Sequence, residues 1–216
     1  MMALMVDDII VSRAGTLVHV RHGDKRAEVL IDALGETAVD SAIQAMDARL
    51  AAGATLADAL GAATSIRDVP RRCARIAAPG ELLVLDDRDA VTAAEVRRSL
   101  QVLAGLTRGT SARSFAVVGE LDTEPADWFE AHDALGRIVV RLDVSQLVVI
   151  GHGARHLHNA AGLEGSWDGE SLLVDTVDEA YAGLRDRVRA GDIVLVTGGG
   201  RTDLGPLVDR LIGAAA

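Results

Sequence analysis

Apolar residues recur along the chain in two different patterns, and the change between them lies near residues 70–80. In the first part, short runs rich in β-branched residues span 9–20 and 27–34, with the turn sequence His22-Gly23-Asp24 between them. Two such runs joined by a glycine-containing turn predict a β-hairpin.

Two helices are predicted to follow this hairpin. Apolar residues over 39–50 repeat at a helical spacing, and Gly53 provides a stop. The hydroxyl of Thr55 can cap a second helix that runs to about Ala63. Residues 1–79 are therefore expected to form a small ββαα unit, which alone would bury little apolar surface.

From residue 80 onward, short apolar runs alternate with helical segments. The runs, nearly continuous and mostly β-branched, are 82–85, 115–118, 147–150, 172–174 and 193–196. Runs of this kind are typical of parallel strands covered on both faces. Helix starts are indicated by Thr92 and Thr176, each followed by glutamate three residues on, and by Pro125. Right-handed crossovers then predict a doubly wound, mostly parallel, Rossmann-like α/β sheet over 80–216, whose ligand crevice lies beyond the carboxyl ends of the strands.

The net charge and the low aromatic content of the chain argue against two classes of binding partner, nucleic acids and membranes. The chain has 22 basic and 32 acidic side chains, a formal net charge of −10, and 2% aromatic residues. A field this negative repels nucleic acid and anionic lipid, and so few rings cannot form a platform for stacked bases. We therefore expect neither a nucleic-acid nor a membrane partner.

Cysteine use and the first residues indicate a cytoplasmic protein. Cys73 is the only cysteine, so an intramolecular disulfide is excluded. Asp7 and Asp8 give the start of the chain the wrong charge for a signal peptide. No apolar run approaches the roughly 20 residues that cross a bilayer.

Lys25 is the only lysine, which limits the chemistry available to the chain. A P-loop needs a lysine after a glycine-rich turn, and the residues before Lys25 do not form one. Charged neighbours keep this lysine solvated, so a Schiff-base role is not expected either. We expect no ATP phosphate site and no cofactor.

Several loops at the predicted strand ends carry candidate ligand groups. Asp86, Asp87 and Asp89 could hold Mg²⁺ or an ammonium group, or could form a solvated turn before a helix. Glu120 follows the second strand and is a weak signal alone. The sequence Gly198-Gly199-Gly200-Arg201 could form an anion nest or merely a tight turn.

The sequence from Gly151 to His156 resembles a dinucleotide-binding turn, with Asp175 at the position of a ribose-binding acid. However, His156 stands where that turn needs a glycine. His152, His156 and His158 could suggest a metal site, although a surface cluster explains them without one. Triad chemistry is not indicated, because no histidine lies near Cys73 in the sequence.

The order of motifs resembles the C-terminal half of the Mur ligases, most closely the MurF type. The matching segments are Leu34-Gly35 with Val39, Val84-Leu85-Asp86-Asp87, Val118-Gly119-Glu120 with His132 and Gly136 beyond, Arg141-Leu142-Asp143-Val144, and the strand that starts near Gly191. The resemblance implies that 1–79 corresponds to the end of the family's central ATPase domain and 80–216 to its C-terminal domain. It also implies a link to peptidoglycan synthesis, in which MurF enzymes add D-alanyl-D-alanine to a UDP-MurNAc-tripeptide.

Departures from the family pattern fall at its reaction centre. Residues 86–93 correspond to the family's D-D-x-Y-N-A-N-P loop, but they lack both of its asparagines, its tyrosine and its proline. Thr37 and Ser41 replace a histidine and an asparagine, and Thr197 replaces a lysine. The P-loop, the Mg²⁺ ligands and the carbamylated lysine of the family would lie before residue 1. Because losing one preorganised polar group costs ~10²–10³ in rate, we expect no ligase activity from this chain by itself.

The preferred hypothesis is a Mur-ligase-like binding module without catalytic or metal-ligating residues. Its candidate ligand contacts are Asp86, Asp87, Asp89, Thr92, Glu120, His132, Thr197, Gly198, Gly199 and Arg201. Its expected partners are a peptidoglycan-precursor peptide and either a second copy or another cell-wall protein that covers the N-terminal unit. The alternatives are a truncated or split ligase whose ATPase part is on another chain, and a dinucleotide-binding module.

Overall fold

The structure, a computed structural model, describes residues 4–124, 126–165 and 170–213. The chain forms two compact units, Met1–Val69 (unit 1) and Pro70–Ala216 (unit 2). This division lies before the expected boundary at 79/80, because β4 (Ala74–Ala78) pairs with β5 (Leu82–Asp87) in the sheet of unit 2. No helix of the described residues is long and apolar enough to cross a membrane.

Unit 1 contains an antiparallel sheet of three strands: the expected hairpin with its turn at His22-Gly23-Asp24 is confirmed, but the run expected as its first strand forms two strands. The elements in chain order are β1 (Met5–Ser12), β2 (Gly15–His22), β3 (Lys25–Ile31), α1 (Glu36–Ala51) and α2 (Leu56–Ala63). The run 9–20 breaks into two strands at Gly15, where φ is +135°. A Cβ atom on Gly15 would lie 2.1 Å from the carbonyl oxygen of Ile31, so only glycine fits there.

One face of this sheet packs on both helices. The buried side chains are Val18, Val20, Val29 and Ile31 from the sheet, Val39, Ala42 and Met46 from α1, and Leu56, Ala59 and Ala63 from α2. Thr55 caps α2 through a reciprocal pair of hydrogen bonds with Asp58, as expected.

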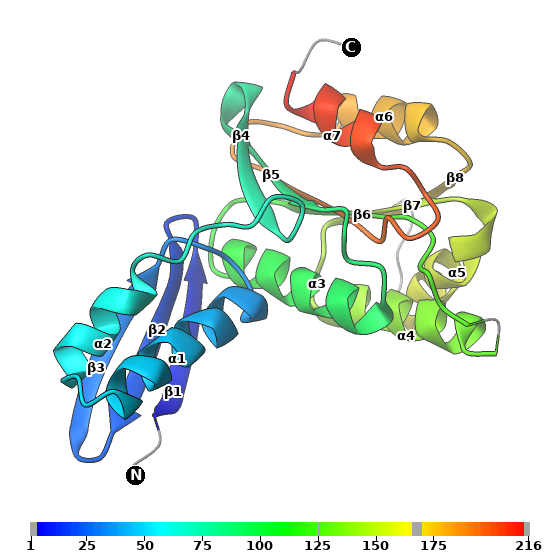
Figure 1. Ribbon diagram of the computed structural model, residues 1–216. Helices are drawn as coiled ribbons and strands as arrows, with labels where there is room; N and C mark the ends of the chain where they lie inside the picture. The colour runs from blue at the N-terminus through cyan, green and yellow to red at the C-terminus, as the bar shows by residue number, and fades with distance from the viewer. Residues whose placement is uncertain (1–3, 125, 166–169, 214–216) are drawn as a thin grey trace. The chain divides into compact units, whose positions relative to one another are not determined.

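Unit 2 is a six-stranded sheet in the order β4-β5-β9-β6-β7-β8, with β4 antiparallel and the others parallel. Its remaining strands are β6 (Ser114–Val118), β7 (Gln146–Ile150), β8 (Ser171–Val174) and β9 (Ile193–Thr197). Its α-helices are α3 (Ala93–Thr107), α4 (Trp128–Arg141), α5 (Arg155–Glu164), α6 (Val177–Arg185) and α7 (Gly205–Leu211). Figure 1 shows α3, α4 and α5 on one face of the sheet and α6 and α7 on the other, which confirms the doubly wound fold.

The five parallel strands are the five predicted runs, and their side chains are mostly buried. Thr92 and Thr176 cap α3 and α6 through capping boxes, as predicted. Pro125, predicted to mark a helix start, lies outside the described residues. The chain reverses direction across the sheet after β8, so β9 inserts between β5 and β6 and brings their following loops together.

Candidate functional site

Residues at the carboxyl ends of adjacent strands form one continuous edge, which we call the carboxyl edge. Asp87 of β5 lies in register with Thr197 of β9, and Thr197 lies in register with Val118 of β6. The backbone N–H of Gly119, directly after β6, donates to the carbonyl oxygen of Thr197 at 3.1 Å. The structure therefore brings together the loops that the sequence singles out.

Asp86 forms a buried ion pair with its near neighbour Arg88. Its two carboxylate oxygens accept from Nε and Nη2 of Arg88 at 2.8 and 2.9 Å. The hydrogen bonds that Arg88 donates to Asp86 raise the pKa of its guanidinium. This bidentate pair uses both oxygens of Asp86, which leaves little capacity for a cation or an ammonium group.

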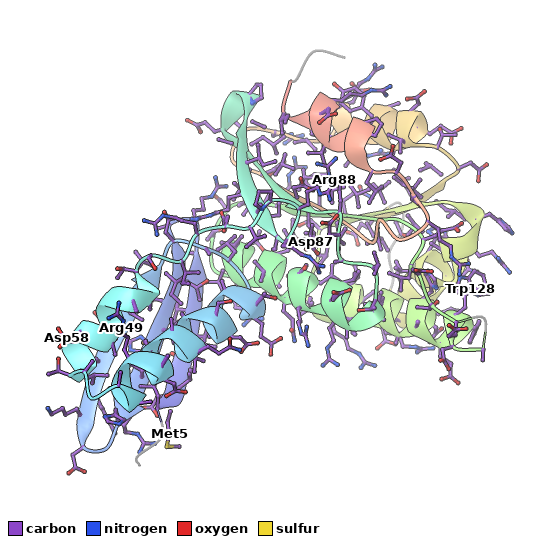
Figure 2. The ribbon with its side chains drawn as sticks, in the orientation of Figure 1. Met5, Arg49, Asp58, Asp87, Arg88 and Trp128 are labelled. Carbon is purple, nitrogen blue, oxygen red and sulfur yellow. The ribbon has the colours of Figure 1, made fainter. Side chains whose placement is uncertain are left out.

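Asp87 is buried and bonded on both sides. One oxygen accepts from the backbone N–H of Cys73 at 2.9 Å, and the other accepts from the hydroxyl of Thr197 at 2.8 Å. Burial raises the pKa of Asp87 to about 6, although hydrogen bonds from Ser99, Thr197 and Cys73 oppose that shift. Figure 2 shows Asp87 and Arg88 on opposite sides of the sheet. Asp87 and Thr197 thus join strands to one another.

Asp89 and Thr92 lie on the loop from β5 to α3. The carboxylate of Asp89 pairs with Arg71 at 3.3 Å. The hydroxyl of Thr92 accepts from the backbone N–H of Glu95, whose carboxylate accepts from the N–H of Thr92. Burial acts to raise the pKa of Glu95, but its hydrogen bonds outweigh this and lower the pKa to about 2. Thr92 therefore serves as a helix cap.

The carboxylate of Glu120 occupies the turn that resembles a dinucleotide-binding motif. Its Oε1 accepts from the backbone N–H of Gly153 at 2.6 Å. A Cβ atom on Gly153 would lie 2.3 Å from this carboxylate, and one on Gly151 would lie 2.7 Å from it. The glycines leave space for the carboxylate of Glu120. This carboxylate occupies the place beside the backbone N–H groups that a bound phosphate would need.

His132 is fully buried and uses both ring nitrogens. Its Nδ1 lies 2.8 Å from the carbonyl oxygen of Trp128, and its Nε2 accepts from the backbone N–H of Leu121 at 3.4 Å. These partners require a neutral ring with the proton on Nδ1. Burial lowers the pKa of His132, which also favours this form. The histidine therefore anchors the loop after β6 to α4.

The glycine turn after β9 is needed for close packing of loops. Gly198 has a φ of +76°. A Cβ atom on Gly199 would lie 2.4 Å from the carbonyl oxygen of Arg88, and one on Gly200 would lie 2.5 Å from the backbone nitrogen of Asp122. These approaches favour the tight-turn interpretation of this sequence over the anion nest.

Arg201 is the candidate with the most exposed charged group at this edge. Its backbone N–H donates to the carbonyl oxygen of Glu120 at 3.0 Å. Its guanidinium donates to the carbonyl oxygen of Thr123 and lies 3.7 Å from Asp122 Oδ1, yet the side chain is 49% exposed. This guanidinium can still bind a ligand carboxylate.

The three neighbouring histidines do not converge on a common point. The ring of His156 contacts the rings of Trp128 and Phe129, with centroids 5.2 and 4.7 Å away. His158 Nδ1 lies 2.6 Å from the hydroxyl of Ser171. Within residues 4–124, 126–165 and 170–213, no group of three or more histidine, cysteine or acidic residues could hold a metal ion.

The most important partners of the predicted residues were not predicted. Arg88 reaches back to Asp86, the backbone of Cys73 donates to Asp87, and Thr202 accepts from the N–H of Glu120 through its hydroxyl. In the sequence, Cys73 draws attention only through its thiol, whereas in the structure its backbone N–H makes the contact with Asp87. Only the turn-forming glycines could have indicated that these loops pack tightly against one another.

Comparison with known proteins places this arrangement in context. The family model described as Mur ligase, glutamate ligase domain, matches residues 71–200. A UDP-N-acetylmuramoyl-tripeptide--D-alanyl-D-alanine ligase of Mycobacterium tuberculosis (strain ATCC 25618 / H37Rv) is 34% identical over 205 residues, which are 88% of this chain and 40% of that protein. The enzyme of the same name from Mycobacterium leprae (strain TN) is 33% identical over 215 residues, 92% of this chain and 41% of that protein.

Solved structures share the fold. MurF from Acinetobacter baumannii superimposes with a TM-score of 0.77 at 20% identity, covering 97% of this chain and 45% of that one. MurF ligase from Thermotoga maritima in complex with ADP also gives 0.77, at 16% identity, covering 98% and 46%. The chain spans about two fifths of the length of the curated relatives it matches.

Proposed function

Because this chain belongs to the Mur ligase family, we propose that it serves cytoplasmic peptidoglycan-precursor metabolism as a binding module that forms no amide bond by itself. The observation that carries this proposal is the occupancy of the carboxyl edge by the chain's own groups. Asp86, Asp87, Glu120 and His132 all have internal hydrogen-bond partners. Polar groups that already hydrogen-bond to neighbouring loops are not available to stabilise a reacting carboxylate or phosphate.

Binding can still use the exposed rim of this edge. Arg201 supplies a guanidinium that is half-exposed, and Asp89 supplies a partly exposed carboxylate. A precursor peptide carries both carboxylates and ammonium groups, so these two side chains match its charges. The ligand class follows from the name of the mycobacterial relatives, which act on a UDP-N-acetylmuramoyl-tripeptide and D-alanyl-D-alanine.

A thermal-shift panel tests the binding role. We expect the UDP-N-acetylmuramoyl-tripeptide or D-alanyl-D-alanine to raise the melting temperature by several degrees at saturating concentration, because ligand at 100 times Kd adds about 2.7 kcal/mol. ATP with Mg²⁺ and NAD should leave it unchanged. An Arg201→Ala variant should lose the shift, whereas Arg210→Ala, which removes an arginine paired with Asp178, should keep it.

Other outcomes of this panel favour the alternatives. A response to ATP with Mg²⁺ would contradict the proposal and support a truncated or split ligase, whose support is that the relatives are much longer than this chain. Mixing the chain with a candidate ATPase chain and peptide substrate, and measuring ADP release, then tests that alternative. A response to NAD would support a dinucleotide-binding module.

A protein partner is proposed for unit 1. Ile10 lies in register with Leu17, and Leu17 with Leu30, so these side chains form a row across the sheet face opposite the core. Ile10 and Leu30 are each 48% exposed. A row of exposed apolar side chains marks an interaction surface, so we propose a second copy or another cell-wall protein as its cover. Native mass measured beside the ligand panel distinguishes these from a monomer.

A further inference from the structure

Strand β1 is an outer strand of the unit 1 sheet, and we call its side that faces away from β2 the free edge. Among the strands that the structure describes, β2 alone pairs with β1. Exposed isoleucines lie on both faces of β1: Ile10 is 48% exposed on the outer face, and Ile9, in register with the core residue Val18, is 44% exposed. An edge strand of this kind, without lysine or proline, is a template for pairing with another strand.

The backbone groups at the free edge belong to Ile9 and Val11. Ser12 closes the two-residue turn from β1 to β2, and the pair that closes such a turn is hydrogen-bonded. Bonded and non-bonded pairs alternate along an antiparallel ladder, so Ile10 bonds to β2 whereas Ile9 and Val11 point away from it. The N–H of Ile9 agrees with this direction, because it donates to the carboxylate of Asp8 at 2.9 Å in an exposed position.

A bulge limits the length of the free edge. The register between β1 and β2 shifts at Asp7, which is one extra residue on β1. A bulge of this kind bends the strand, so a straight partner strand cannot follow β1 past it. The side chain of Asp7 also pairs with Arg21 of β2 at 3.3 Å. Pairing at the free edge is therefore limited to residues 8–12, a stretch centred on Ile10.

We propose that two copies of this chain pair antiparallel through their β1 strands, with Ile10 opposite Ile10 of the second copy. Ile9 then lies opposite Val11 of the second copy, and their outward N–H and C=O groups exchange two hydrogen bonds on each side of the symmetry axis. Shifting the strands by two residues in either direction keeps only one such bonded pair, because the other would meet the bulge or the turn. The free edge is therefore self-complementary in this one register, which favours a second copy over an unrelated strand.

The side chains fit the same register. Asp8 faces Ser12 of the second copy, whose hydroxyl can donate to the Asp8 carboxylate. The two Asp8 residues lie about 13 Å apart along the strands, which exceeds the Debye length of about 8 Å at physiological salt. The outer row of Ile10, Leu17 and Leu30 continues into the second copy. This inference rests on the proposed protein partner of unit 1, which it identifies as a second copy, and it is independent of ligand binding at the carboxyl edge.

An Ile9→Pro variant of the whole chain tests the pairing. Proline removes the N–H of residue 9, which takes no part in the bonds between β1 and β2. By sedimentation equilibrium we expect the parent chain to form dimers and Ile9→Pro to raise the dissociation constant about tenfold or more, since each dimer loses two hydrogen bonds. Glu28→Pro is the matched control, because by the same alternation it removes an outward N–H from β3, at the other edge of the sheet.

The control variant should dimerise like the parent chain. A monomeric parent chain, or equal dissociation constants for the parent chain and Ile9→Pro, would overturn the proposal. Neither result alters the thermal-shift test of the carboxyl edge, so the two proposals fail separately.

A cysteine cross-link tests the register and keeps the proposal falsifiable if Ile9→Pro fails to fold. In the proposed dimer the two copies of residue 10 form a non-hydrogen-bonded pair with Cα atoms about 4.5 Å apart, a distance that a disulfide spans. We expect Ile10→Cys to form a disulfide-linked dimer under mild oxidation, seen on a non-reducing gel. Leu30→Cys is the matched control, because Leu30 is also 48% exposed but lies on β3, and Cys73 is buried. No cross-link in Ile10→Cys, or equal cross-linking in both variants, would overturn the proposed register.

Discussion

Replacing His132 with leucine will lower the free energy of unfolding by about 2–4 kcal/mol at pH 7.5. The leucine side chain has a similar volume but no polar atoms. It therefore leaves the N–H of Leu121 without an acceptor in a buried loop, and it removes the bond to the Trp128 carbonyl. Urea denaturation followed by circular dichroism measures the change.

The matched control is His158→Leu. His158 is only partly buried and has the hydroxyl of Ser171 as its partner, so the expected loss is below about 1 kcal/mol. Equal losses in the two variants would show that His132 is not the special anchor of the loop after β6. A loss confined to pH values below 6 would instead indicate that charge on the ring, rather than its hydrogen bonds, stabilises the fold.

An Asp87→Asn variant will change how stability depends on pH. Because the pKa of Asp87 is raised from 3.8 to about 6, the folded protein binds this proton more tightly than the unfolded chain does. The contribution to stability is therefore full below pH 3.8 and is lost as the pH rises through about 6. When the pH falls from 7.5 to 4.5, this carboxyl group therefore raises the free energy of unfolding of the parent chain by about 2 kcal/mol. Asparagine does not titrate, so the variant lacks this gain. The amide oxygen keeps an acceptor for Cys73.

The measurement is the difference in unfolding free energy between variant and parent chain, taken at both pH values. Relative to the parent chain, Asp87→Asn should be more stable at pH 7.5 than at pH 4.5. Asp192→Asn serves as the control of opposite sign. Burial acts to raise the pKa of Asp192, but the bonds from Arg113 and Arg189 outweigh it and lower the pKa. The same slope in both variants would contradict this assignment.

The parallel strands were predictable because each is an almost unbroken apolar run, and β5, β6, β7 and β9 are buried along their whole length. The edge strand β4 was missed because Ala74–Ala78 contains an arginine and is only partly buried, so its pairing with β5 alone defines it as a strand. The break between β1 and β2 was missed for a different reason. Ser12 and Gly15 are a weak turn signal that the apolar runs on both sides outweighed, and the close approach of Gly15 to Ile31 is a tertiary contact that the sequence does not show.

The same distinction applies to the carboxyl edge. Its location followed from the expectation that the crevice lies beyond the carboxyl ends of the strands, and the sequence indicated Asp86, Asp87 and Glu120 there; the insertion of β9 between β5 and β6 was seen only in the structure. What could not be predicted was that these carboxylates bond to Arg88, Cys73 and Gly153 of the same chain. Such partners depend on side-chain direction and on loops far apart in the sequence, which spacing alone does not define.

Whether the chain forms an amide bond on its own is decided most directly by a ligation assay. The purified chain would be mixed with ATP, Mg²⁺, the UDP-N-acetylmuramoyl-tripeptide and D-alanyl-D-alanine, with a full-length ligase of the family as the positive control. We predict no ADP release and no pentapeptide product above the level of a sample without protein. Product formed in proportion to the concentration of this chain would contradict its assignment as a binding module.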